Sequence, residues 1–175
     1  IIPLGIADAS PVVRIRALDA AIATSTDVKS ILNSSLTDPN TSVRRAALER
    51  LSEGKHGLPQ STVDTALALA IRDEEPGIAD LALMASTRLG APDAVAARLT
   101  VALANRSEAL RTKAAAASQG LVLQDPAAAR ALLEPILGDE SHDVRVALLA
   151  PLANALAATM DAPEIAKLLA ASEAR

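Results

Sequence analysis

The 175-residue chain contains no phenylalanine, tryptophan, tyrosine or cysteine. Without aromatic rings it has no platform for stacking single-stranded bases, no cage for a quaternary ammonium group and no flat surface for a sugar ring. Without cysteine it can form no disulfide, no thiolate zinc site and no thiol nucleophile. The cellular compartment stays open, because a cysteine-free chain suits an oxidising space as well as the cytosol.

The sequence also lacks an excess of basic residues and a long apolar run. It has 17 lysines and arginines against 21 acidic residues, a formal net charge of -4, whereas a nucleic-acid-binding protein normally carries a basic excess or a basic face. The most apolar stretch, 146–160, contains Pro151 and Asn154 and is shorter than the roughly 20 residues of a membrane-spanning helix. We therefore expect no membrane span, and the charge argues against a nucleic-acid partner.

Helix-forming residues are abundant instead. Alanine supplies 40 residues and leucine 26, and both are strong helix formers. A hydrophobic fraction of 50% favours a folded protein over a disordered one, and the length suits a single domain over 1–175. The first five residues contain no initiator methionine and no basic leader, so we expect the chain to be an excerpt of a longer protein.

A motif recurs five times, starting near residues 8, 38, 73, 105 and 139. Each copy opens with Asp or Asn, then has an apolar residue and an arginine, and continues into an Ala/Leu-rich run; the third copy has Ala79 in place of the arginine. A period just above thirty residues is typical of a repeated helix pair with variable loops. We expect the second helix of each pair at 26–36, 61–72, 92–104, 126–137 and 162–173.

Prolines mark the ends of some of these helices. Asp125 followed by Pro126 predicts an N-cap and a first helical position. Pro135 and Pro151 fall inside apolar helical patterns, which predicts a kink or an early break at each, because proline lacks the amide hydrogen that a helix interior needs.

The motif resembles the HEAT repeat, and its best copy has Asp38, Val43, Arg44, Ala47 and Leu48. The resemblance implies an all-α, right-handed solenoid of about five stacked antiparallel helix pairs, with the motif helices lining its concave side. It implies no catalytic residue. Elementary packing agrees, because a single helix pair cannot bury its own apolar face and neighbouring pairs must stack.

Opposite charges recur at fixed positions of the motif. The arginines are Arg14, Arg44, Arg111 and Arg145, and the loop acids are Asp8, Asp38, Asp73 and Asp139. The arginines could grip an acidic partner or phosphates, or they could pair with the loop carboxylates as a structural ladder. The fixed position of both charges favours the ladder.

The first two motif helices carry further charges, which are our candidate partner-binding residues: Arg16, Asp19, Arg45, Glu49 and Arg50. The equivalent positions in later copies are Met84, Ala116 and Ala150. These small or apolar residues either form a wall for an apolar helix or reflect close packing of the helices themselves.

No enzyme signature is present: the sequence has no glycine-rich phosphate loop, no nucleophile elbow and no His-Glu-x-x-His pair. The two histidines, His56 and His142, match no metal motif, so we expect no metal and no cofactor. The sequence favours a non-catalytic scaffold that presents a concave helical surface to a partner peptide or helix. The alternatives are nucleic-acid binding through the arginine-rich helix starts, and a structural or regulatory spacer of a larger enzyme or membrane protein.

Overall fold

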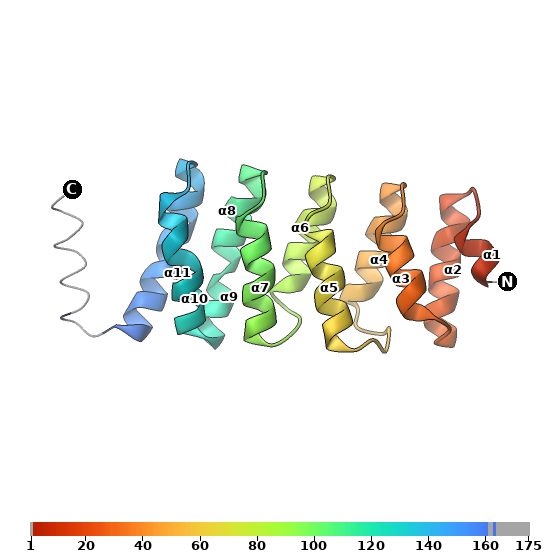
Figure 1. Cartoon of the computed structure of the whole chain (residues 1–175), viewed down its shortest axis with the longest axis horizontal. Helices are drawn as coiled ribbons and strands as arrows, with labels where there is room; N and C mark the ends of the chain where they lie inside the picture. Colours follow the sequence, from red (N-terminus) through yellow and green to blue (C-terminus); the bar gives the residue numbers. More distant parts are fainter. Residues whose placement is uncertain (1, 161–162, 164–175) are drawn as a thin grey trace. The chain divides into compact units, whose positions relative to one another are not determined.

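The computed structural model describes residues 2–160 and residue 163 (Figure 1). All the helices and turns in this range belong to an all-α repeat architecture, and no strand occurs among the described residues. Contacts between α-carbons divide the chain into two compact units, Ile1–Gly90 and Ala91–Arg175. The helix expected at 162–173 lies outside the described residues.

The first unit is a row of antiparallel helix pairs preceded by a short helix. Its elements are α1 (Ile2–Ile6), α2 (Pro11–Thr24), α3 (Val28–Leu36), α4 (Thr41–Ser52), α5 (Gln60–Ala70) and α6 (Pro76–Ser86). The motif helices α2, α4 and α6 contact one another in order, and α3 contacts α5 in a second layer. The predicted second helices at 26–36 and 61–72 therefore correspond to α3 and α5, each shifted by at most two residues at either end.

Leucine and alanine side chains fill the space between these two layers. Leu18 on α2, Leu32 on α3, Leu48 and Leu51 on α4 and Leu67 on α5 are all fully buried. Alanines alternate with them, so the helices approach closely without a bulky aromatic residue. A thin core of this kind explains how the unit folds without phenylalanine, tyrosine or tryptophan.

The second unit repeats the arrangement. Its elements are α7 (Pro92–Leu103), α8 (Glu108–Ala117), α9 (Gln119–Gln124), α10 (Pro126–Leu133), the 3₁₀ helix η1 (Glu134–Gly138) and α11 (His142–Thr159). Helices α8 and α11 contact each other in the motif layer, and α7 contacts α10 in the other. The expected helix at 92–104 is α7, and the one at 126–137 is α10 followed by η1.

The two internal prolines behave differently. At Pro135 the α-helix ends and a 3₁₀ turn takes over, as expected for a residue without an amide hydrogen. At Pro151 no break occurs, because α11 continues through the proline to Thr159. Leu148 and Leu152, which flank Pro151, are buried, so packing against α8 and α10 holds the helix together despite the lost hydrogen bond.

Within the described residues, no helix combines the length and the apolar character that crossing a bilayer requires.

Candidate functional site

Motif arginines of the first unit hold the loop aspartate of the following copy. Arg14 donates from Nε to Asp38 Oδ2 and from Nη2 to Asp38 Oδ1, both at 2.7 Å. Arg44 makes the same fork with Asp73, at 2.7 and 2.9 Å. The two parallel hydrogen bonds of each fork fix distance and orientation together, so each pair connects one helix pair to the next.

The remaining terminal nitrogen of each arginine binds its own loop. Arg14 Nη1 donates to the carbonyl oxygen of Asp8 at 2.8 Å, and Arg44 Nη1 donates to that of Asp38 at 2.9 Å. The Asp38 carboxylate also accepts from the backbone amide of Asn40 at 2.8 Å, which closes an Asx turn before α4. One guanidinium therefore joins two consecutive loops.

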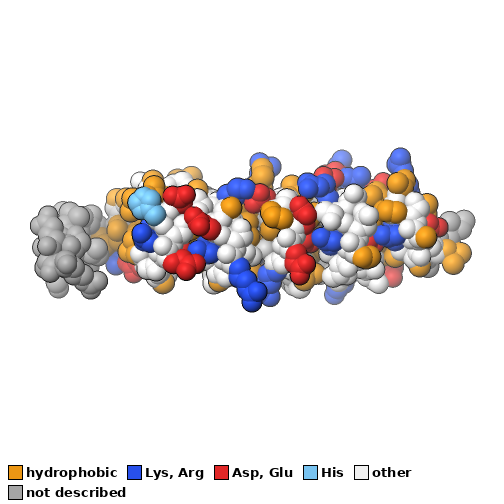
Figure 2. Space-filling view, turned by 90° about the horizontal axis from the view of Figure 1, so that it is seen from above, with side chains coloured by type: hydrophobic (Ala, Val, Ile, Leu, Met, Phe, Trp, Pro, Cys, Tyr) orange, Lys and Arg blue, Asp and Glu red, His pale blue; other side chains and the backbone are white. Residues whose placement is uncertain are grey.

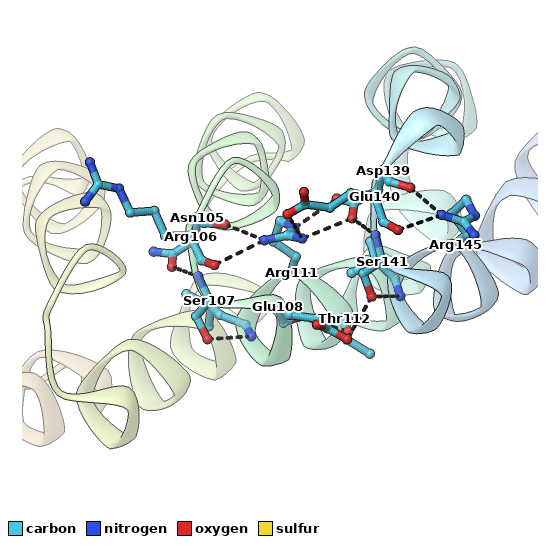
Figure 3. A network of polar contacts seen from close by, with 12 residues as sticks. Asn105, Arg106, Ser107, Glu108, Arg111, Thr112, Asp139, Glu140, Ser141 and Arg145 are labelled. Carbon is cyan, nitrogen blue, oxygen red and sulfur yellow. Dashed lines mark hydrogen bonds and ion pairs between the residues drawn. The ribbon is translucent and has the colours of Figure 1, made fainter.

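The second unit contains the same network, drawn in Figure 3. Arg111 lies between two loops, with Nη1 donating to the Asn105 carbonyl at 3.1 Å and its fork reaching Asp139 at 2.9 and 3.1 Å. Nη2 also contacts a carboxylate oxygen of Glu140 at 3.4 Å. Arg106 contributes only its carbonyl to Arg111, and its side chain points away from the network.

The side chains of Ser141 and Glu108 complete this network. Ser141 Oγ donates to Glu108 Oε1 at 2.8 Å and accepts from the amide of Val144 at 3.3 Å. Ser141 is thus both the N-cap of α11 and a link to the first turn of α8. Ser141 and Glu108 are 33 residues apart in the sequence, so they meet only because two helix pairs stack.

These ion pairs are largely buried. The side chains of Arg111 and Asp139 are each 9% exposed. The hydrogen bond from Arg111 lowers the pKa of the Asp139 carboxyl below its ordinary value. For Asp38, burial acts to raise the pKa, but the bonds from Arg14 and the Asn40 amide outweigh it and the net change is downward. Both aspartates are therefore held in the charged form.

Asp19 and Arg50, two of the candidate partner-binding residues, form a second contact between motif helices. Arg50 Nε on α4 donates to Asp19 Oδ1 on α2 at 2.9 Å, and its Nη1 contacts Glu53 at 3.4 Å. Arg16 lies 3.9 Å from Asp19 and has a side chain that is 80% exposed. The structure therefore brings Arg16, Asp19 and Arg50 together across α2 and α4.

Arg45 and Glu49 lie on the exposed side of α4. Arg45 Nη2 is 2.9 Å from the point that a β-carbon on Gly77 would occupy. Glycine at the start of α6 thus leaves room for the Arg45 guanidinium to lie against the helix. We refer to Arg16, Asp19, Arg45, Glu49 and Arg50 together as the α2–α4 charged face.

The second unit has an apolar groove on its other layer, of about 550 Å³ between α7 and α10. Its walls are mostly alanine and leucine, including Ala97, Leu103, Ala131 and Leu132. On the motif layer of this unit, Ala116 on α8 and Ala150 on α11 are exposed. Exposure of both alanines argues against the interpretation that they serve only close helix packing.

The histidines take no part in these networks. His56 Nδ1 accepts from the amide of Leu58 at 3.0 Å, and its Nε2 lies 3.1 Å from the carbonyl oxygen of Leu51, so the ring closes the turn after α4. His142 is exposed at the first position of α11. Over the residues with a described position, no group of three His, Cys, Asp or Glu side chains is arranged to hold a metal ion.

Positive and negative side chains are interspersed on the face drawn in Figure 2, which shows no continuous basic stripe over the described residues. Three of the four motif arginines, Arg14, Arg44 and Arg111, donate their hydrogen bonds to aspartate carboxylates and backbone carbonyls. Phosphate binding needs cations that are free to approach the backbone of a nucleic acid, and these arginines are engaged elsewhere.

Comparison with known families gives a match to part of this chain. The HEAT repeat associated with sister chromatid cohesion matches residues 17–51, which run from α2 through α3 to α4. A comparison with curated proteins gives no match. The family match covers one repeat, and the same helix pairs, loop aspartates and forked arginines recur in both units. The chain is therefore similar to a HEAT-repeat protein over residues 17–51, and its all-α repeat architecture agrees with that match.

Proposed function

We propose that this protein is a non-catalytic interaction scaffold whose motif helices present a surface to a peptide or helix of a partner protein. HEAT repeats suggest a helical scaffold for protein interactions, and the resemblance implies that the motif helices line its concave side. The carrying observation is the α2–α4 charged face, where Asp19 and Arg50 are locked by a 2.9 Å bond between neighbouring helices.

The α2–α4 charged face is a suitable binding site because its central arginine is already held in place before a partner binds. Arg50 is held by Asp19 and Glu53, but unlike the ladder arginines its side chain is still 31% exposed. Little side-chain entropy is therefore lost when a partner's carboxylate approaches it. Arg16, Arg45 and Glu49 flank this pair and are exposed. Charges of both signs on a fixed spacing favour a polar peptide with its own alternating charges.

Aromatic anchors must come from the partner. Binding hot spots are enriched in tryptophan, tyrosine and arginine, and of these the chain contains only arginine. The exposed Ala116 and Ala150 supply a flat apolar wall on the motif helices of the second unit, against which a partner's larger side chains can pack.

The test begins with a displayed library of helical peptides selected on the wild-type protein. Titration calorimetry then compares the selected peptides with the Arg45→Ala/Arg50→Ala variant and with a control, Lys29→Ala/Arg130→Ala, which changes the same charge on the other layer. We expect at least a tenfold loss of affinity, about 1.4 kcal/mol, for the first variant only. Equal affinity for both variants would place the binding surface elsewhere.

The nucleic-acid alternative receives no support from a particular observation, because the arginines it relies on are forked onto aspartates. A spacer role within a larger protein remains the second candidate. It predicts that no peptide is selected on any face of this chain.

A further inference from the structure

The third motif helix of the first unit, α6, carries an exposed apolar residue where the first two motif helices carry acids. Met84 occupies the position of the repeat that is Asp19 in the first copy and Glu49 in the second. Its side chain is 54% exposed, whereas the neighbouring Leu83 and Ala85 are buried. Met84 therefore does not fill the core, and its thioether is open to a ligand.

The same side of α6 continues with an apolar residue and a cation. Leu81, which is half-buried, precedes Met84 by three residues, and the exposed Arg88 follows it by four. The amide of Leu89 still donates to the Ala85 carbonyl at 3.1 Å, so the backbone keeps a helical turn up to Arg88. Residues three and four apart are neighbours on a helix surface, with β-carbons about 5–6 Å apart. We call Leu81, Met84 and Arg88 together the Met84 strip.

The α2–α4 charged face reaches the beginning of α6. Arg45 on α4 brings its Nη2 atom to 2.9 Å from the point that a β-carbon on Gly77 would occupy. Gly77 precedes Met84 by seven residues, which is about 10 Å along a helix axis, and positions seven apart lie on the same side of a helix. One ligand that runs along α6 can therefore contact both the Arg45 guanidinium and Met84.

We propose that the Met84 strip binds an aromatic side chain of the partner peptide, and that Arg45 binds an acidic residue of the same peptide. The sulfur of methionine makes favourable contacts with an aromatic ring, often at the ring edge. An arginine guanidinium is attracted to the ring face, and Leu81 adds apolar contact area beside the two. This inference rests on the scaffold function proposed above and names the chemistry of the partner.

Composition and charge both favour this occupant. The chain contains no aromatic residue, so a ring that lies between Met84 and Arg88 has to come from another molecule. Arg45 supplies the complementary charge for a carboxylate. Because Gly77 and Met84 are seven residues apart, a helical peptide along α6 places its acidic residue about two turns from its aromatic residue.

The lack of aromatic residues makes a direct test possible. The methyl groups of Met84 and Met160, the two methionines of the chain, are isotope-labelled and followed by nuclear magnetic resonance while a peptide selected from the helical library is added. Any ring-current shift must then come from the peptide. We expect the Met84 signal to shift and the signal of Met160, at the end of α11, to stay in place. Replacing the aromatic residue of the peptide by leucine should abolish the shift and weaken binding about tenfold.

A matched pair of variants locates the contact. Met84→Glu introduces the acid that the second copy has at this position, and it should weaken peptide binding about tenfold with unchanged far-UV circular dichroism. Leu69→Glu introduces the same charge on α5, in the other layer, at a side chain that is 45% exposed. This control should bind the peptide like the wild type.

The scaffold function and the aromatic site fail in different ways. If peptides are selected and Arg45→Ala/Arg50→Ala weakens their binding while the Met84 signal does not shift, the scaffold function stands and the aromatic site is overturned. The aromatic site is equally overturned if the selected peptides contain no aromatic residue, or if Leu69→Glu weakens binding as much as Met84→Glu does. If no peptide is selected, both proposals are wrong.

Discussion

At the scale of single residues, the guanidinium group is the part that links the repeats. Its planar fork matches the two oxygens of a carboxylate while the third nitrogen reaches two carbonyl groups. Lysine could not do this, because its ammonium is a point charge without a fixed fork. The sequence changes both partners of a pair together. The third copy has Ala79 in place of the arginine, and the loop that this arginine would reach opens with Asn105 in place of an aspartate.

Replacing one such arginine should be costly. Arg111→Met keeps the apolar stem but leaves the 9%-exposed Asp139 without its counter-ion. We expect unfolding in urea, followed by far-UV circular dichroism, to show a loss of about 3 kcal/mol. The control is Arg130→Met, which breaks an exposed pair with Glu134 on one helix and should cost less than about 1 kcal/mol. Equal losses in the two variants would mean that burial adds nothing to the Arg111 pair.

At the scale of elements, capping residues and prolines determine where helices end, whereas packing against neighbouring helices determines whether a helix interior stays continuous. Asp125 caps α10 by accepting from the amide of Ala128 at 3.0 Å, as the sequence predicted. Pro135 ends that helix, but Pro151 does not end α11. The difference is not local, because both prolines lack the same hydrogen; it lies in the buried leucines around Pro151.

The residue that follows α2 has a backbone conformation that can be made more stable by substitution. Ser25 follows the helix with a φ of 53°, a left-handed conformation, and its amide donates to the Ile22 carbonyl at 3.2 Å. Glycine adopts this conformation without the penalty of about 1 kcal/mol that a β-carbon brings. Ser25→Gly should therefore raise the free energy of unfolding by about 1 kcal/mol.

A matched change inside a helix should have the opposite sign. Ser34 is an exposed residue within α3, and Ser34→Gly should lower the free energy of unfolding by about 0.5 kcal/mol, because glycine is a poor helix former. If thermal unfolding shows both variants to be less stable than the wild type, strain at Ser25 is not relieved by glycine.

At the scale of the whole molecule, the ladder makes stability depend on pH in both units. Asp38 in the first unit and Asp139 in the second have pKa values lowered in the folded state. A lowered folded-state pKa stabilises the protein above the unfolded value of about 3.9 and loses that effect as the pH falls through the folded value. Acid should thus weaken both units.

We expect the free energy of unfolding to change little between about pH 7 and pH 5 through these groups, and to fall steadily below about pH 4. Urea titrations at a series of pH values measure this. Asp139→Asn should lower stability at neutral pH and also flatten the decline in acid, since one titrating carboxyl is gone. An unchanged slope would show that Asp139 does not contribute to acid unfolding.

The sequence alone determined the helices, the repeat and the residue types of the ladder. These follow from local rules, because alanine and leucine favour helix and each apolar stripe needs a neighbouring pair to cover it. The sequence placed Arg14 and Asp38 at fixed positions, but nothing local states which aspartate each arginine meets.

Only the tertiary structure decided those pairings. Arg14 and Asp38 are 24 residues apart and Arg111 and Asp139 are 28 apart, so the contact exists only once two helix pairs stack. The same is true of the Asp19–Arg50 bond, the Ser141–Glu108 bond and the continuity of α11 through Pro151. In each case the deciding energy comes from neighbours distant in sequence, which a local pattern does not contain.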